Sequence, residues 1–139
     1  MRVDVKQDVF KLAQVFRISR GARTEAKVLT VTVEDDQARG WGECVPYARY
    51  DETLDSVEAE IRSFSGNWAT LAEELPAGAA RNALDCALWD HACKAKGIRI
   101  WDHLGVPMPQ PEITAYTLSL DTPDAMERQA RQNAHRPLL

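Results

Sequence analysis

Apolar and polar residues alternate through the first third of the chain, as they do in half-buried β-strands. The alternation runs through residues 1–6 and, after an irregular stretch, through residues 16–19. β-Branched residues then dominate positions 28–33, and they favour a pleated surface. A third run over residues 40–45 ends before a proline, which cannot donate to a strand ladder. These segments predict a three-stranded antiparallel meander.

The middle third follows the helical period instead. Apolar residues recur every three or four positions from 54 to 64 and again from 77 to 96, which predicts two helices with apolar faces. Between them, Thr70 and Glu73 have the spacing of a capping box, which predicts a short helix. Gly97 is placed to end the long helix, and the many alanines of that helix predict close packing against a neighbour.

A cluster of prolines divides the chain. Pro107, Pro109 and Pro111 restrict the backbone to extended conformations and remove its donors, which is typical of a linker. We therefore expect one domain over residues 1–111 and the start of another over residues 112–139.

The segment after this linker predicts one βα unit. Residues 113–120 alternate like a strand, and Thr122 followed by Pro123 is typical of a helix start, with the helix reaching about residue 134. A proline and two leucines at 137–139 predict entry into another strand.

Length and composition narrow the possible folds and partners. The 139 residues leave room for about one domain and exclude a complete (β/α)8 barrel, which needs about 250. A net charge of −4 with scattered basic residues argues against a nucleic-acid partner. No apolar run approaches the roughly 18 residues of a membrane span, and three of the first six residues are charged, where a signal peptide would have an apolar run. Three cysteines without paired spacing fit a reducing compartment. We therefore expect a cytoplasmic protein with neither a nucleic-acid nor a membrane partner.

Two connections carry candidate binding residues. Arg17, Arg20 and Arg23 cluster with Gly21 between the first two predicted strands, and guanidinium groups match carboxylates in shape and charge. A solvated basic loop is the alternative interpretation. Residues 46–51 are rich in tyrosine and polar groups and connect the sheet to the helices, where binding loops are common. An ordinary connection is the alternative there.

Other catalytic chemistry has less support from the residues. Glu43 follows two glycines that suit close backbone approach within a strand, and we interpret it as a structural carboxylate rather than an acid or base. Four potential zinc ligands lack a Cys-x-x-Cys pair, and the helix stripe explains the cysteines as small apolar residues; they are Cys86, His91, Cys93 and His103. No Gly-x-Ser-x-Gly elbow is present. The residues alone therefore predict substrate-contacting loops without a complete catalytic constellation.

Four motifs in chain order complete the pattern. They are Arg20-Gly21-Ala22-Arg23-Thr24-Glu25-Ala26, Gly40-Trp41-Gly42-Glu43-Cys44-Val45-Pro46, the stretch 79–90 (AARNALDCALWD) and Ile100-Trp101-Asp102-His103-Leu104-Gly105. This order resembles the N-terminal capping domain of the enolase superfamily, in its muconate-lactonizing (mandelate racemase) branch. Within the branch, the chain is most similar to the dipeptide (L-Ala-D/L-Glu) epimerases.

The resemblance implies a fold and a reaction. The fold is α+β: a three-stranded antiparallel meander plus a helical subdomain over residues 1–111, then the first βα unit of an incomplete (β/α)8 barrel over residues 112–139. The reaction is a 1,1-proton transfer at the carbon next to a carboxylate, through an enediolate that Mg²⁺ stabilises in an intact parent enzyme. In the family, two lysines and three acidic Mg²⁺ ligands on later barrel strands do this work, and no residue here matches them. We therefore expect no catalytic residue, metal ligand or cofactor in this chain alone.

The resemblance also assigns substrate contacts to two capping loops and to the end of the first barrel strand. These residues are Arg20, Gly21, Arg23, Thr24, Tyr47, Tyr50, Thr117 and Ser119. We expect the N-terminal fragment of an isomerase, a Mg²⁺-dependent dipeptide epimerase, that is inactive alone and whose parent binds a small dipeptide. One alternative is a capping module that pairs with a separate barrel chain or with its own copy. Another is a fragment of an enzyme like muconate cycloisomerase or o-succinylbenzoate synthase.

Overall fold

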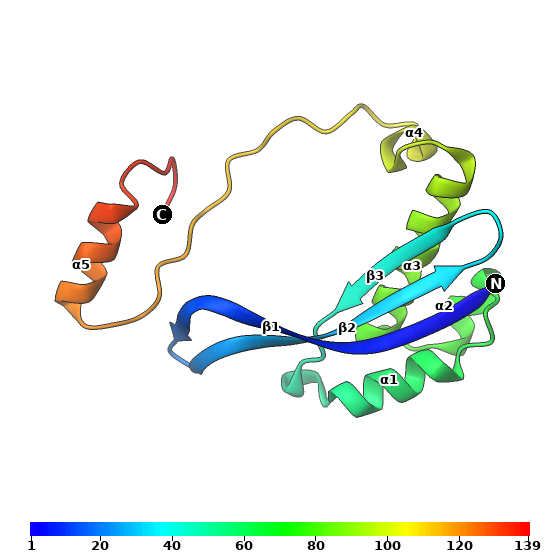
Figure 1. The fold of residues 1–139 in the computed structure, drawn as a ribbon, viewed down its shortest axis with the longest axis horizontal. Coiled ribbons are helices and arrows are strands. Elements are labelled where there is room, and N and C mark those ends of the chain that lie inside the picture. Colours follow the sequence, from blue (N-terminus) through cyan, green and yellow to red (C-terminus); the bar gives the residue numbers. More distant parts are fainter. The chain divides into compact units, whose positions relative to one another are not determined.

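The computed structural model describes residues 1–139 (Figure 1), and the chain divides into two compact units. Residues 1–9 and 27–108 form the first unit, and residues 10–26 and 109–139 form the second. None of the helices combines the length and apolar character that crossing a bilayer requires.

The sheet is the predicted three-stranded antiparallel meander. It contains β1 (Arg2–Ile18), β2 (Gly21–Glu34) and β3 (Arg39–Cys44) in the order β1-β2-β3. The β2–β3 register runs from Leu29 opposite Cys44 to Glu34 opposite Arg39. Both β1 and β2 are longer than predicted, because the stretch that reads as irregular is a hairpin whose residues are mostly exposed on both faces. Without a buried face, alternation is not needed there, so the sequence carries no strand period.

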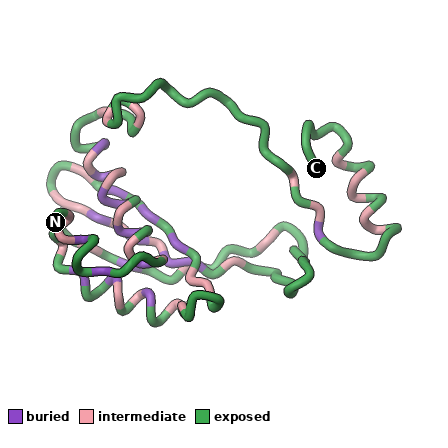
Figure 2. The backbone as a smooth tube through the Cα atoms, turned by 180° about the vertical axis from the view of Figure 1, so that it is seen from behind, coloured by how far each residue is buried: buried purple, intermediate pink, exposed green.

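The hydrophobic core of the first unit lies between the sheet and the helices. The helices are α1 (Leu54–Ser63), α2 (Leu71–Glu74), α3 (Ala79–Lys96) and α4 (Ile100–Leu104), with single 3₁₀ turns at Ala48–Tyr50 and Trp68–Thr70. Buried residues follow the sheet and α3 (Figure 2). The largest fully buried side chains are Leu29, Val31, Val33, Val57, Ile61, Leu84 and Leu88. The predicted helices at 54–64 and 77–96 are thus confirmed, and Gly97 ends α3 at φ +66°.

The long helix α3 lies directly against β3 through two glycines. A Cβ on Gly40 would stand 2.0 Å from the carbonyl oxygen of Ala87, and one on Gly42 would stand 2.0 Å from that of Ala83. Asp90 accepts a hydrogen bond from the Trp41 N–H at 2.8 Å, which ties the same two elements together. The close approach predicted for the Gly-Trp-Gly segment is therefore made to the alanine face of α3.

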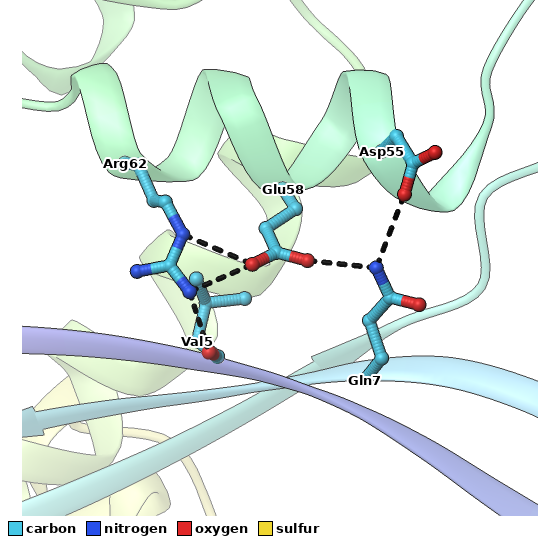
Figure 3. Close-up of polar contacts among 5 residues, drawn as sticks. All are labelled: Val5, Gln7, Asp55, Glu58 and Arg62. Carbon is cyan, nitrogen blue, oxygen red and sulfur yellow. Dashed lines mark hydrogen bonds and ion pairs between the residues drawn. The ribbon is translucent and has the colours of Figure 1, made fainter.

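Polar side chains join β1 to α1 (Figure 3). Gln7 donates to Asp55 (3.2 Å) and to Glu58 (2.8 Å), and Arg62 pairs with Glu58 at 2.7 Å. Arg62 also donates to the carbonyl oxygen of Val5 at 3.3 Å. The hydrogen bonds from Gln7 and Arg62 lower the pKa of Glu58. Exposed pairs of this kind each contribute little, so the buried Val5 side chain makes the main contact of β1 with the core.

The predicted capping box before α2 is wrong. Thr70 is the N-cap residue, but its side chain makes no cap bond and instead donates to Glu74 and to the carbonyl of Asn67. The Glu74 carboxylate that engages the Thr70 hydroxyl also accepts from the N–H and the hydroxyl of Ser65.

The C-terminal part of the second unit has its helix but not its predicted strands. Helix α5 (Pro123–Gln132) begins as expected, with the Thr122 hydroxyl accepting from the Ala125 N–H at 3.4 Å. Residues 106–122 and 137–139 form no helix or strand. Two backbone hydrogen bonds connect this part of the chain to other segments without forming a ladder: the Tyr116 N–H donates to the Leu138 carbonyl, and the Leu120 N–H donates to the Arg17 carbonyl. A strand needs a ladder of such bonds with a neighbour, and alternation alone does not supply one.

Candidate functional site

The arginine-rich loop is the tip of the β1–β2 hairpin, in the second unit. A turn at Ser19 and Arg20 leads to Gly21, whose φ of +146° is rarely adopted by residues with a side chain. A Cβ there would meet no atom within 4 Å, so the requirement for glycine is conformational rather than steric. Arg20, Arg23 and Thr24 are exposed on this tip. The hairpin therefore presents cationic groups on a turned, hydrogen-bonded scaffold, as a carboxylate-binding loop would.

Ser119 and Thr117 lie in the same unit but differ in environment. Thr117 is exposed, whereas Ser119 is 7% exposed. The Ser119 hydroxyl accepts from the Arg17 N–H at 2.9 Å and donates to the Val15 carbonyl at 2.9 Å. The structure thus joins Ser119 to the hairpin that carries the arginines, through its backbone.

The two predicted tyrosines lie together in the first unit. Tyr47 precedes the 3₁₀ turn after β3 and Tyr50 is its last residue, with the two ring centroids 6.0 Å apart. They line an open cavity of about 590 Å³ between the end of β3 and the start of α3. Its other lining residues are Glu43, Cys44, Val45, Glu52, Ala77, Gly78, Ala79 and Asn82.

Glu52 organises this cavity, and sequence reasoning did not identify it. Its carboxylate accepts from the Tyr47 N–H at 3.1 Å and from the Ala79 N–H at 2.8 Å. Gly78, the N-cap residue of α3, has no side chain to cap that helix, so Glu52 supplies the oxygen from another segment. One carboxylate therefore holds the tyrosine loop against the helix start. No local spacing signals this role, because 27 residues separate Glu52 from Ala79.

The cavity holds a thiol that is poorly suited to nucleophilic chemistry. Burial, with smaller contributions from the charges of Glu52 and Glu43, raises the pKa of Cys44 to about 11. A thiol must ionise to act as a nucleophile, so Cys44 is a packing residue of the core.

The residues present do not fit a metal site. Across residues 1–139, no group of three or more His, Cys, Asp or Glu side chains is placed to hold a metal ion. The two histidines considered as zinc ligands are used elsewhere: His91 hydrogen-bonds to Asp35 at 2.8 Å, and the His103 ring packs edge-on against Trp89 at 5.2 Å. No catalytic step through Mg²⁺ can therefore be assigned to groups of this chain.

Comparisons with known proteins agree with the resemblance. Residues 1–105 match the family "Mandelate racemase / muconate lactonizing enzyme, N-terminal domain". The L-Ala-D/L-Glu epimerase of Escherichia coli is 42% identical over 134 residues, which cover 92% of this chain and 42% of the relative.

Solved structures share the fold. An enolase family member from Agrobacterium tumefaciens with homology to dipeptide epimerases, bound to sodium and L-Ala-L-Glu, superposes with a TM-score of 0.89 at 43% identity over 97% of this chain and 43% of that one. A dipeptide epimerase from Methylococcus capsulatus, complexed with Mg and L-Arg-D-Lys, gives a TM-score of 0.80 at 26% identity over 96% of this chain and 42% of that one.

The chain spans about two fifths of the length of each of these relatives. The family match covers most of the chain, including β1 to α4 and both glycines that seat α3 on β3. The chain therefore belongs to the mandelate racemase/muconate lactonizing enzyme branch of the enolase superfamily, as an N-terminal capping domain of the dipeptide-epimerase-like kind.

Proposed function

We propose that this chain is the substrate-selecting part of a Mg²⁺-dependent epimerase of acidic dipeptides. The observation that carries the proposal is the 42% identity over 134 residues with an L-Ala-D/L-Glu epimerase, together with the arginine-bearing hairpin tip. The A. tumefaciens relative holds L-Ala-L-Glu, a dipeptide with two carboxylates. Arg20 and Arg23 on the hairpin tip suit such a ligand, because guanidinium groups bind carboxylates with paired hydrogen bonds.

The tyrosine loop of the first unit is a separate proposed substrate contact of an intact parent enzyme. Tyr47 and Tyr50 present rings beside a cavity, and Glu52 fixes the loop that carries them. We assign to these rings the packing of the apolar part of the dipeptide. Thr24 and Thr117 add exposed hydroxyl groups on the hairpin and on the segment that bonds to β1 beside the hairpin tip.

We further propose that, in an intact parent enzyme, residues 112–139 form the first βα unit of a barrel, where neighbouring strands would supply the ladder that residues 113–120 lack here. Two contacts support this: the Tyr116 N–H donates to the Leu138 carbonyl at 3.0 Å, and the Arg136 guanidinium lies 3.8 Å from the centroid of the Tyr116 ring. These contacts join the two segments predicted as successive strands, and successive strands of such a barrel are neighbours. The remaining barrel would contribute the lysines and the Mg²⁺ ligands that the resemblance implies.

A chimera tests the proposal. Residues 1–139 replace the matching N-terminal part of the E. coli epimerase, and epimerisation of L-Ala-D/L-Glu is followed with and without Mg²⁺. We expect Mg²⁺-dependent turnover. Arg23→Gln should raise KM roughly tenfold or more, the equivalent of a lost charge-assisted hydrogen bond, while the exposed Arg128→Gln should not. A folded chimera that turns over muconate or succinylbenzoate substrates but no dipeptide would contradict the dipeptide assignment.

A second candidate is a module that pairs with a separately encoded barrel. Residues 113–120 favour it, because they alternate like a strand but lie in no ladder, and strand-like backbone outside a ladder can pair with another chain. Size-exclusion chromatography with mass measurement of the chain mixed with a barrel fragment tests this idea. A chain that stays monomeric in the mixture counts against it.

A further inference from the structure

Ser119 is a buried polar residue in an exposed segment. It is 7% exposed, while both Thr117 and Leu120 are exposed. A buried hydroxyl is tolerated where its donor and acceptor both find partners. The hydrogen-bond partners of the Ser119 hydroxyl therefore explain why this side chain is buried.

Its partners are backbone groups of β1, more than a hundred residues away in sequence. Ser119 Oγ accepts from the Arg17 N–H and donates to the Val15 carbonyl, both at 2.9 Å. The next residue extends the pattern, since the Leu120 N–H donates to the Arg17 carbonyl at 2.9 Å. Because β1 is an edge strand, alternate backbone groups along it lack a strand neighbour. Ser119 and Leu120 supply partners for three such groups.

These bonds lie directly before the hairpin tip. Arg17 is separated from the turn at Ser19 and Arg20 by a single residue. The proton of the Ser119 hydroxyl is committed to Val15, so the hydroxyl has no donor left for a ligand. The contacts therefore act on the hairpin rather than on a substrate.

We propose that Ser119 is a positioning residue that fixes the arginine-bearing hairpin tip on the segment carrying Thr117; its consequence for substrate binding rests on the proposed function. The Ser119 hydroxyl must act as both acceptor and donor, because it bridges an N–H and a carbonyl of the same strand. Alanine removes both bonds, whereas threonine retains a hydroxyl. Thr117→Ala removes an exposed hydroxyl two residues away and is the matched control.

Amide hydrogen exchange of the whole 139-residue chain, followed by NMR, tests the positioning role directly. Ser119→Ala should speed exchange of the Arg17 amide roughly fivefold to tenfold, the equivalent of about one hydrogen bond. Ser119→Thr should restore slow exchange, and Thr117→Ala should leave it unchanged. Amides of α3 should keep their protection in every variant, because α3 lies in the first unit. Unchanged exchange at Arg17 in Ser119→Ala would overturn the proposal, and so would loss of α3 protection, since Ser119 would then support the whole fold.

The chimera provides a second measurement, of substrate binding, whose outcome is independent of the hydrogen-exchange result. There, Ser119→Ala should raise KM for the dipeptide several-fold, with Ser119→Thr restoring it and Thr117→Ala changing it less. A KM that does not change in Ser119→Ala would overturn the link between hairpin position and binding. An inactive chimera would instead refute the proposed function and leave the exchange result standing.

Discussion

A methyl group added at Gly42 tests the packing that defines this capping fold. In Gly42→Ala the new Cβ would lie 2.0 Å from the Ala83 carbonyl oxygen and 3.0 Å from the Ala87 amide nitrogen. A carbon and a carbonyl oxygen approach to about 3.3 Å at closest. The new Cβ would therefore lie more than an ångström too close to a backbone oxygen. No side-chain rotation relieves such a clash, so α3 must move away from β3.

The cost follows from what α3 buries. Its face against the sheet contains Ala83, Leu84, Ala87 and Leu88, all fully or almost fully buried. A gap of about an ångström forfeits a quarter to a half of the dispersion energy at each contact, and overpacking typically costs 1–3 kcal/mol or more. Because only backbone can move, we expect a loss of about 3 kcal/mol or more of unfolding free energy.

Thermal unfolding followed by circular dichroism measures this loss. At about 4 °C per kcal/mol, Gly42→Ala should lower Tm by about 12 °C or more. Gly97→Ala is the control: its φ of +66° is strained for alanine, but a Cβ there meets no atom within 4 Å, so about 1–2 kcal/mol is expected. Adding Ala83→Gly should not rescue Gly42→Ala, because the clash is with a carbonyl. Equal Tm shifts in Gly42→Ala and Gly97→Ala would refute the close-approach argument.

Three further predictions concern side chains of the first unit. Glu52→Ala should lower the free energy of unfolding by about 1–2 kcal/mol and speed hydrogen exchange of the two amides that donate to Glu52, those of Tyr47 and Ala79. Equal exchange in wild type and variant would contradict the bridging role. Iodoacetamide at pH 8 should alkylate the exposed Cys86 but not the buried Cys44, since a pKa of about 11 leaves about one thiolate in a thousand; equal labelling by mass spectrometry would exclude this. The pKa of Asp35 is lowered, chiefly by its hydrogen bond to His91. The Asp35 carboxylate therefore stabilises the fold at pH values above its unfolded pKa of about 3.9. That stability is lost as the pH falls through the lower pKa of the folded state. Asp35→Asn should therefore flatten the acid limb of a urea-unfolding series between about pH 4 and 2, and an unchanged slope would count against it.

The meander, the two main helices and the family could be predicted from the sequence. A strand or helix with one buried face places apolar residues at a regular period along the chain, and that period can be recognised. The sequence did not show which elements meet. The glycines of β3 and the alanines of α3 each predicted close packing, but only the fold shows that they are each other's partners. The long hairpin was underestimated because residues that are exposed on both faces carry no period.

The substrate contacts assigned to the candidate site stay predictions, whereas its long-range bonds could not be predicted from the sequence. Ser119 was predicted to contact substrate from its place in a predicted strand, and no local pattern signals that its hydroxyl bonds to the backbone of β1. Glu52 was missed because its partners lie on two other segments. The residues 113–120 alternate without forming a ladder, since alternation records a favoured pattern of exposure and not the presence of a neighbouring strand.

We propose that this chain selects the substrate of a dipeptide epimerase and that the barrel of an intact parent enzyme moves the proton. The most direct measurement is deuterium incorporation at the α-carbon of L-Ala-D/L-Glu in D₂O, followed by NMR for the chimera and for the 139-residue chain at equal concentration. We expect Mg²⁺-dependent incorporation by the chimera and none above background by the chain alone. Incorporation by the chain alone, or a folded chimera that exchanges no dipeptide proton, would contradict it.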